Sequence, residues 1–157
     1  MKRIRLSQNK IAKIDDADFS LISVHNWHAV EDHGNFYAYT NVKIDGKRTI
    51  RQMHRLIMAA PKGIQVDHIN GDGLDNRRSN LRLCTQTQNA RNCRVRAVSK
   101  SKFKGILWVT KRGKWRARIS AANKRLYSGY FDTEIAAAKR YDEMARKHHG
   151  DFARTNF

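Results

Sequence analysis

Residues that stabilise small secreted proteins, or that carry a chain across a membrane, are scarce in this sequence. It has two cysteines, Cys84 and Cys93, which do not form a C-x-x-C pair, so neither a disulfide scaffold nor a zinc ribbon is expected. No apolar run approaches the roughly 20 residues needed to cross a bilayer. The basic N-terminus also lacks the apolar stretch of a secretory signal. These absences predict a soluble, intracellular protein.

Acidic residues are missing from the middle of the chain. The 157 residues carry a formal net charge of +18, and the segment 76–131 holds 16 Lys and Arg but no Asp or Glu. Concentrating one sign of charge costs self-repulsion, which a polyanion relieves. A nucleic acid is therefore the expected partner. An anionic membrane surface is the competing one, but the segment has no basic amphipathic helix.

Alternating residues, turn residues and the single proline organise the first part of the chain. Residues 34–52 predict a β-hairpin, because bulky residues alternate along its first strand and Asp45-Gly46 supplies a turn. Residues 15–22 and 53–60 are expected to form short helices, the second of which ends before Pro61. These elements indicate a small β-rich region followed by a helix.

A strand, a long polar loop, a second strand and a helix are expected in turn between residues 64 and 93. The strands are predicted at 64–68 and 81–84. Thr85 and Gln88 fit the capping box that begins a helix.

The last third of the chain predicts three strands and one helix. The strands are expected at about 104–110, 115–121 and 125–131. Asp132 or Thr133 would cap the helix, which Gly150 would end. Its predicted apolar face consists of Ala137, Tyr141, Met144, Ala145 and His148.

Polar and titratable side chains gather between residues 67 and 92. Asp67 and His68 are adjacent, and carboxamides follow on the loop and the predicted helix. Carboxylate and amide oxygens suit a hard cation such as Mg²⁺, and a neutral histidine can take a proton from water near pH 7. The set suits hydrolysis of a phosphodiester, with an ordinary polar turn as the alternative. A calcium loop is excluded because Ile69 breaks its ligand pattern, and zinc lacks a second His or Cys at ligand spacing.

Over about forty residues this segment resembles a known family. The stretch MHRLIM…GIQVDHINGDGLDNRRSNLRLCTQTQNARN, from Met53 to Asn92, is similar to the HNH endonuclease motif of phage and intron-borne homing endonucleases. The resemblance implies a ββα-metal fold, in which two strands and a helix surround one divalent cation. By position, Asp67 matches the first metal ligand and His68 the general base. Asn80 matches the central Asn, which orients the histidine and braces the loop.

Other residues receive expectations from the same motif. Asn89 takes the place of the last His and would be the second metal ligand. His54 is expected to be a core histidine, with bracing of the site as the alternative. Adjacent strand residues point to opposite faces, so Asp67 and His68 can share a site only where the strand ends or twists. Asp72, Asp75 and Asn76 are assigned to loop structure, and Arg77, Arg78 and Arg82 to phosphate contacts or solvated charge.

Residues 101–157 alternate bulky and basic positions, as in a sheet with one nucleic-acid face. Arg116 and Arg118 alternate with Trp115, Ala117 and Ile119, so the two arginines share a face. Trp108 is either a base contact or a packing residue. The candidate DNA contacts of this region are Lys104, Lys114, Arg116, Arg118 and Arg125.

This region resembles the APETALA-two/ERF DNA-binding domain over nearly its whole length. The matching stretches are SKFKGILWV, GKWRARI and GYFDTEIAAAKRYDEMARKHHG…NF. The resemblance implies a three-stranded sheet that lies in the major groove, with a helix packed behind it. Leu107 stands where the plant proteins have a base-reading Arg, and one extra residue precedes Gly113. The plant recognition sequence is therefore not expected.

Together these features predict an α+β protein with four segments. A small β-rich N-terminal region (1–52) precedes a ββα-metal (HNH) nuclease core (53–95). A basic linker (96–102) leads to a three-stranded antiparallel sheet with one helix (103–157).

The expected activity is that of a site-specific DNA endonuclease of the homing type, in which His68 activates water for metal-assisted hydrolysis of phosphodiester bonds. The expected cofactor is one divalent cation, Mg²⁺ or Mn²⁺, and the expected partner is double-stranded DNA, with no membrane and no protein partner implied. The expected location is the cytoplasm of a bacterial host cell. A non-catalytic DNA-binding regulator with a vestigial nuclease core is the alternative, and a structural RNA-binding protein is a third interpretation.

Overall fold

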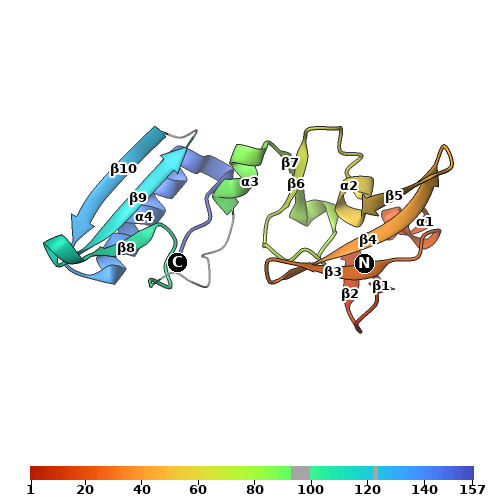
Figure 1. Cartoon of the computed structure of the whole chain (residues 1–157), viewed down its shortest axis with the longest axis horizontal. Coiled ribbons are helices and arrows are strands. Elements are labelled where there is room, and N and C mark those ends of the chain that lie inside the picture. The colour runs from red at the N-terminus through yellow and green to blue at the C-terminus, as the bar shows by residue number, and fades with distance from the viewer. Residues whose placement is uncertain (93–99, 122–123) are drawn as a thin grey trace. The chain divides into compact units, whose positions relative to one another are not determined.

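The computed structural model describes residues 1–92, 100–121 and 124–157, and the chain forms two compact units, Met1–Gln86 and Thr87–Phe157 (Figure 1). Four small antiparallel sheets and several short helices confirm the predicted α+β class. Cys93 and most of the predicted linker lie outside the described residues. Within the described ranges, no helix is long and apolar enough to cross a membrane.

Two antiparallel sheets form the N-terminal part of the first unit. The predicted hairpin with its turn at Asp45-Gly46 is confirmed, as is the short helical segment near residues 15–22. The other three strands were not predicted, because they are four or five residues long and show little alternation. The elements are β1 (Lys2–Arg5) paired with β2 (Ile11–Ile14), a 3-10 turn (Asp16–Asp18), α1 (Phe19–Ser23), and the sheet of β3 (His28–Asp32), β4 (Asn35–Ile44) and β5 (Lys47–Gln52).

The remainder of the first unit contains the predicted helix and the two predicted motif strands. Helix α2 (Met53–Ile57) ends before Pro61, and β6 (Gln65–His68) pairs antiparallel with β7 (Leu81–Cys84). A 3-10 turn, Arg78–Asn80, leads into β7. Cys84 is buried, as expected of a small core residue.

One hydrophobic cluster holds the whole first unit together. It takes residues from β2, β3 and β4 as well as from α2, β6 and β7, among them Ile14, Ala38, Met53, Val66 and Leu81. The segments 1–52 and 53–86 therefore pack as one body, whereas the sequence divided them into a separate region and a nuclease core. The two segments share this core, and the bounds at residues 52 and 53 stay a prediction.

The second unit begins with α3 (Gln86–Asn92) and contains one sheet and one long helix. The three predicted strands are confirmed as β8 (Ile106–Val109), β9 (Lys114–Ala121) and β10 (Lys124–Phe131), with β9 in the centre. Helix α4 (Glu134–His149) covers one face of this sheet (Figure 1). Thr133 is its N-cap, since its hydroxyl accepts the N–H of Ala136 at 3.1 Å.

The buried face of α4 differs in part from the prediction. Ala137, Tyr141 and Ala145 are buried against the sheet as expected. His149 is buried instead of His148. Asp142 is also buried, because its carboxylate accepts hydrogen bonds from the backbone N–H groups of Asn156 and Phe157 at 2.8–2.9 Å. The C-terminal residues therefore supply the hydrogen-bond donors that a buried carboxylate needs. The periodicity of the helix alone does not predict this contact.

A β-bulge sets which side chains of β10 face away from α4. Arg125 pairs with Ser120, whereas Tyr127 pairs with Ile119, so Leu126 is an extra residue in β10. The face of the sheet opposite α4 is called the outer face. It carries Leu107, Val109, Lys114, Arg116, Arg118, Ser120, Arg125, Ser128 and Tyr130.

Candidate active site

The candidate site lies where β6 ends and a twelve-residue polar loop, 69–80, begins. His68 is the last residue of β6, and its carbonyl accepts the N–H of Gly71 at 2.8 Å. The loop returns to β7, where the N–H of Ile69 donates to the carbonyl of Asn80 at 2.9 Å. The end of the strand is therefore closed by hydrogen bonds rather than left open.

The sheet of β1 and β2 contacts this loop. The N–H of Lys13 in β2 donates to the carbonyl of Leu74, and the N–H of Asn76 donates to the carbonyl of Lys13, both at 2.8 Å. Asp75 and Asn76, which make this contact, are 1% and 0% exposed. Segments that are 60 residues apart in sequence thus fix the loop that follows His68.

Ion pairs hold two of the loop arginines. Arg78 binds the buried carboxylate of Asp18 at 2.7 Å, and its backbone N–H donates to Asp15 at 2.8 Å. Arg77 binds Asp75 at 2.6 Å, which lowers the pKa of that carboxyl group. Both arginines were predicted phosphate contacts, and the structure gives each a carboxylate partner within the protein. Whether they also contact a phosphate remains a prediction.

Asn80 forms hydrogen bonds within the loop through both ends of its amide. Its Oδ1 accepts the N–H of Asn70 at 3.0 Å, while its Nδ2 donates to the carbonyl of Asp75 at 2.8 Å and to Oδ1 of Asn70 at 3.0 Å. These bonds occupy the side chain inside the loop. The expected contact that would orient His68 is made by another residue.

Asn76 is the amide that contacts the candidate base. Nε2 of His68 lies 3.2 Å from Oδ1 of Asn76. In the tautomer that carries its proton on Nε2, His68 donates this bond, and Nδ1 is the basic nitrogen. Burial lowers the pKa of His68, an effect that the bond to Asn76 and nearby carboxylates oppose. The ring is therefore neutral near pH 7, as a general base must be.

Two further rings pack against His68. The centroid of the His54 ring lies 5.0 Å from that of His68, with an angle of 80° between the planes, and Tyr37 lies 5.8 Å from His68. Tyr37 and His54 also contact each other, at 6.0 Å. His54 is 6% exposed, and burial lowers its pKa to about 3. The expected core histidine is indeed buried, and it borders the site.

Asp67 points to different partners from its neighbour. It is 5% exposed, and its Oδ2 accepts hydrogen bonds from Nε and Nη2 of Arg82 at 2.8 and 2.6 Å. Arg82 is the residue opposite Asp67 in the β6–β7 ladder. Alternation along β6 separates Asp67 from His68, as the sequence suggested, and their described contacts do not overlap. A site that uses both must therefore lie at the end of the strand.

The donor set at this strand end fits a hard cation better than zinc. Asp67 supplies carboxylate oxygens and the loop supplies amide oxygens, the atoms that Mg²⁺ prefers. Across the three described ranges, no three His, Cys, Asp and Glu side chains cluster closely enough to hold a metal by themselves. Asn89, the second predicted ligand, lies on α3 in the second compact unit, and its role as a ligand remains a prediction.

The second unit carries most of the predicted DNA contacts. Arg116, Arg118 and Arg125 share the outer face, with Arg118 and Arg125 exposed to solvent. Lys114 lies on the same face and pairs with Asp132 at 3.0 Å. The Lys104 ammonium group instead donates to the carbonyl of Arg91, which occupies it within the unit.

Trp108 packs against Trp115 and is also exposed to solvent, so its role as a base contact stays a prediction. Its ring contacts Trp115 at 5.2 Å, and the two are paired across β8 and β9 on the face that α4 covers. The outer face thus presents mainly arginine, lysine and serine, with Tyr130 under the guanidinium of Arg112 at 4.5 Å. A surface of this composition suits a phosphodiester backbone.

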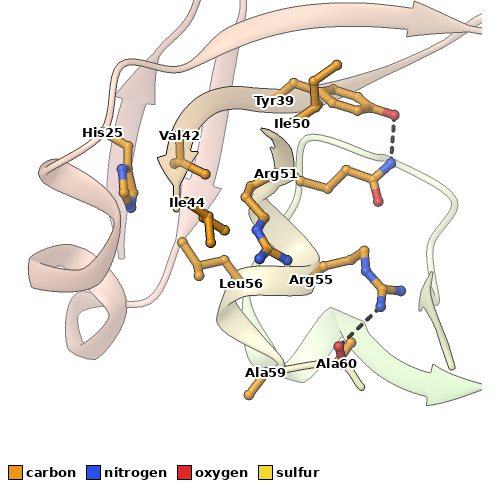
Figure 2. A pocket seen from close by; sticks show the side chains of 11 residues that line it. His25, Tyr39, Val42, Ile44, Ile50, Arg51, Arg55, Leu56, Ala59 and Ala60 are labelled. Carbon is orange, nitrogen blue, oxygen red and sulfur yellow. Dashed lines mark hydrogen bonds between the residues drawn. The ribbon is translucent and has the colours of Figure 1, made fainter. Parts of the chain in front are cut away.

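A separate pocket of about 660 Å³ lies between α2 and the β4–β5 hairpin (Figure 2). Its described lining is mainly apolar, with Val42, Ile44 and Leu56, and it includes Arg51 and Arg55. Arg55 is held by backbone carbonyls, among them that of Ile64 at 2.6 Å. Neither His54 nor His68 lines this pocket. Helix α2 therefore directs one side toward the pocket and the other toward the candidate base.

Sequence reasoning missed two contributors to the site and left the role of a third open between a core histidine and a brace. Asn76 was assigned to loop structure, and no motif position distinguishes it from the other amides of the loop. Tyr37 lies 31 residues before His68 in a strand whose alternation predicts only a sheet. His54 was visible as a possible brace, because it stands in a short helix before β6. Only the folded loop shows that all three meet His68.

Comparison with known proteins finds two groups. The family model described as HNH endonuclease matches residues 51–91. A stretch of 63 residues, 39% of this chain and 14% of that protein, is 43% identical to APETALA2-like protein 2 of Oryza sativa. No solved structure gives a significant match.

Two viral relatives match larger shares of the chain. Protein 3.8 of Escherichia phage T7 is 34% identical over 94 residues, which cover 60% of this chain and 77% of that protein. A protein of Acanthamoeba polyphaga mimivirus, named as an uncharacterized HNH endonuclease, is 30% identical over 151 residues, 88% of this chain and 74% of that one. With the motif match and the geometry around His68, this similarity shows that the chain belongs to the HNH endonuclease family.

Proposed function

We propose that the protein is a site-specific DNA endonuclease of the homing type that hydrolyses phosphodiester bonds in double-stranded DNA. The observation that carries the proposal is His68, a buried and neutral imidazole whose Nε2 is engaged by Asn76 at the end of β6. Membership of the HNH endonuclease family supports a nuclease. The basic outer face of the second unit supports DNA as its substrate.

His68 would act as the general base. With the proton on Nε2 and that group bound to Asn76, Nδ1 takes a proton from the attacking water, and the resulting imidazolium keeps its bond to Asn76. The neighbouring carboxylates of Asp67, Asp72 and Asp75 stabilise the imidazolium, since each raises the pKa of His68. These carboxylates therefore offset part of the cost of charging a buried imidazole.

Asp67 and Asn89 would hold one divalent cation, Mg²⁺ or Mn²⁺. When bound, such a cation neutralises charge on the phosphate and stabilises the leaving oxygen. Arg82 holds the carboxylate of Asp67 in place from the opposite strand. Asn80 would act on the loop, which it keeps folded through Asn70 and Asp75.

DNA would be held mainly by the second unit. In this proposal, residues 53–95 contain the nuclease motif, 96–102 link it to the sheet, and 103–157 bind DNA, inside the bacterial cell where viral and host DNA are present. The candidate contacts are Arg77, Arg78 and Arg82 near the active site, and Lys104, Lys114, Arg116, Arg118 and Arg125 in the second unit. The outer-face arginines are the strongest of these, because no carboxylate partner is described for Arg118 or Arg125.

Cleavage of supercoiled plasmid and of phage and host DNA, with Mg²⁺, with Mn²⁺ and with excess chelator, tests the proposal. Wild-type protein is expected to cut only with metal, and His68→Ala to lose about 10²–10⁴-fold in rate while retaining DNA binding. His33→Ala is the matched control, since His33 is a fully exposed histidine in the same unit. Mapping the product ends on long DNA then shows whether cleavage is confined to one site.

Three results would contradict parts of the proposal. Cleavage by His68→Ala at the wild-type rate would remove the assigned base. Full activity in chelator would remove the cation. Tight DNA binding without any cleavage, under all metal conditions, would support the non-catalytic regulator instead.

A further inference from the structure

We propose that His54 and Tyr37 are positioning residues for the general base: their rings form a wall that fixes the plane of the His68 imidazole. The inference rests on the proposed function of His68. It assigns roles to two residues that are not among the motif positions Asp67, His68, Asn80 and Asn89. One of them, Tyr37, comes from β4, outside the segment that matches the HNH family. The sheet of β3, β4 and β5 would therefore contribute to catalysis by positioning the base.

A hydrogen bond at Nε2 constrains the plane of an imidazole only weakly. Nε2 lies close to the Cβ–Cγ axis about which the ring turns, so the contact with Asn76 at 3.2 Å by itself restricts that rotation little. Rotation moves Nδ1, the basic atom in this tautomer, away from the water it must deprotonate. Contacts with the ring itself are needed to hold its plane, and a displacement of about 1 Å costs up to roughly 10²-fold in rate.

His54 and Tyr37 supply such contacts. The planes of His54 and His68 meet at 80° with centroids 5.0 Å apart, and Tyr37 approaches both rings at angles of 58° and 64°. Edge-to-face packing at this separation is the favoured arrangement of aromatic rings. The three rings therefore contact one another pairwise, and a turn of the His68 ring would change its packing against both neighbours.

The buried state of His54 points to a role beyond filling space. Its Nδ1 is buried, with no hydrogen-bond partner among the described residues, although buried polar atoms are normally satisfied. An apolar ring of similar size would avoid this cost. A histidine ring that tolerates it presents to His68 a flat, uncharged surface whose position α2 and the hydrophobic core determine.

The structure holds Tyr37 in place from the loop side. Asn35 donates from Nδ2 to the Tyr37 hydroxyl at 3.2 Å and to the carbonyl of Gly71 at 3.1 Å. Gly73 lies against the Tyr37 ring so closely that a Cβ there would overlap it. The loop that follows His68 is thus packed onto Tyr37, which joins the wall to the part of the chain that carries the base.

Single-turnover cleavage with enzyme in excess, at saturating metal, tests this inference in the full-length protein. His54→Ala and Tyr37→Ala are each expected to lower the cleavage rate constant about 10- to 100-fold with unchanged DNA affinity. His54→Phe and Tyr37→Phe keep a ring and should stay within about threefold of wild type. Ile57→Ala is the matched control, because Ile57 is a buried core residue of the same helix.

The rate constant separates positioning from simple destabilisation. At saturation with enzyme in excess, partial unfolding removes active enzyme but leaves the rate constant of the folded molecules unchanged, so Ile57→Ala should cleave with the wild-type rate constant. A wild-type rate constant in His54→Ala would overturn the inference. So would an equal loss in Ile57→Ala, or a loss in His54→Phe as large as in His54→Ala.

An NMR measurement tests the wall without relying on cleavage. The order parameter of the Cε1–H group of His68 should fall in His54→Ala and recover in His54→Phe. An unchanged order parameter in His54→Ala would refute the positioning role. If wild-type protein and His68→Ala were equally inactive while the order parameter changed as expected, the proposed function would fail and the positioning inference would stand.

Discussion

Arg82 and Asp67 face each other across β6 and β7, and two guanidinium nitrogens of Arg82 reach the same carboxylate oxygen at 2.6 and 2.8 Å. The carboxylate is almost completely buried, and the arginine is largely so. A cation that binds Asp67 would therefore join an ion pair that already exists. The pair stabilises the folded state without metal, and it fixes the orientation of the proposed ligand.

Arg82→Ala should destabilise the first unit and make its stability depend on metal. Removing one partner leaves a buried charge unpaired, which costs about 3 kcal/mol of unfolding free energy. A divalent cation at Asp67 would replace part of the lost attraction. Urea unfolding in chelator and in excess Mg²⁺ measures both effects. Arg77→Ala, which leaves the buried carboxylate of Asp75 unpaired instead of Asp67, is the comparison and should lose stability without the dependence on metal. Equal stability of Arg82→Ala and wild type in chelator would contradict the prediction.

Cleavage should remain active below pH 6.5. His68 must be neutral to act, and burial lowers its pKa, so the acid limb of kcat/KM should have its midpoint below 6.5. Asn76→Ala should shift the midpoint further down, because the bond to Asn76 raises the pKa of His68. The profile is measured from pH 4.5 to 8 at saturating Mg²⁺. A midpoint above 6.5 in wild type would conflict with a buried base.

Stability of the first unit should fall as the pH is lowered from 6.5 toward 4. The pKa of His54 is about 3 in the folded protein and near 6.5 when unfolded, so the unfolded chain binds the extra proton in this window. Each such proton costs about 1.4 kcal/mol per pH unit. Asp75, whose pKa is lowered by Arg77, adds to the loss only at lower pH.

Trp27 fluorescence in urea reports this pH dependence. In a background with Trp108 and Trp115 replaced by Phe, Trp27 is the remaining tryptophan, and it is buried in the first unit. His54→Phe should reduce the slope of unfolding free energy against pH by about one proton. An unchanged slope would mean that His54 is not the titrating group.

DNA affinity should depend on salt through the outer face. Each phosphate contact contributes roughly 0.9 to the slope of log affinity against log salt. Arg116→Ala combined with Arg118→Ala should therefore lower that slope by up to about 1.8. Lys139→Ala is the control, because Lys139 is an exposed cation on α4, behind the sheet. An equal decrease of the salt slope in Lys139→Ala would mean that any positive charge contributes to DNA binding, wherever it lies on the second unit.

Local patterns predicted the elements of the second unit well because they are regular. Alternation along β9 placed Arg116 and Arg118 on one face, and the N-cap at Thr133 was readable from the sequence. The bulge at Leu126 was not, since its extra residue changes register only through pairing with β9. The burial of Asp142 likewise depends on residues at the end of the chain.

The candidate site was predictable only as far as the motif extends. Resemblance to a family suggested Asp67, His68 and Asn80, and the structure places all three at the end of β6 or in its loop. Asn76 and Tyr37 could not be found this way. Their roles arise from long-range packing, in which β2 fixes Asn76 and β4 brings Tyr37 to the loop. Short strands with weak alternation, such as β1 and β2, conceal such contributions.

The bulge in β10 divides the strand into a part that packs against the core and a part that lies in solvent. On one side of Leu126, Tyr127 and Phe131 pack against the core under α4, while on the other side Arg125 faces outward near the connection between β9 and β10. Deleting Leu126 would leave the pairs Arg125–Ser120 and Tyr127–Ile119 in register and remove only the bulge, so the local twist of the strand would change while the core pairing stays the same. The bulge therefore sets the shape of one end of the outer face independently of the core.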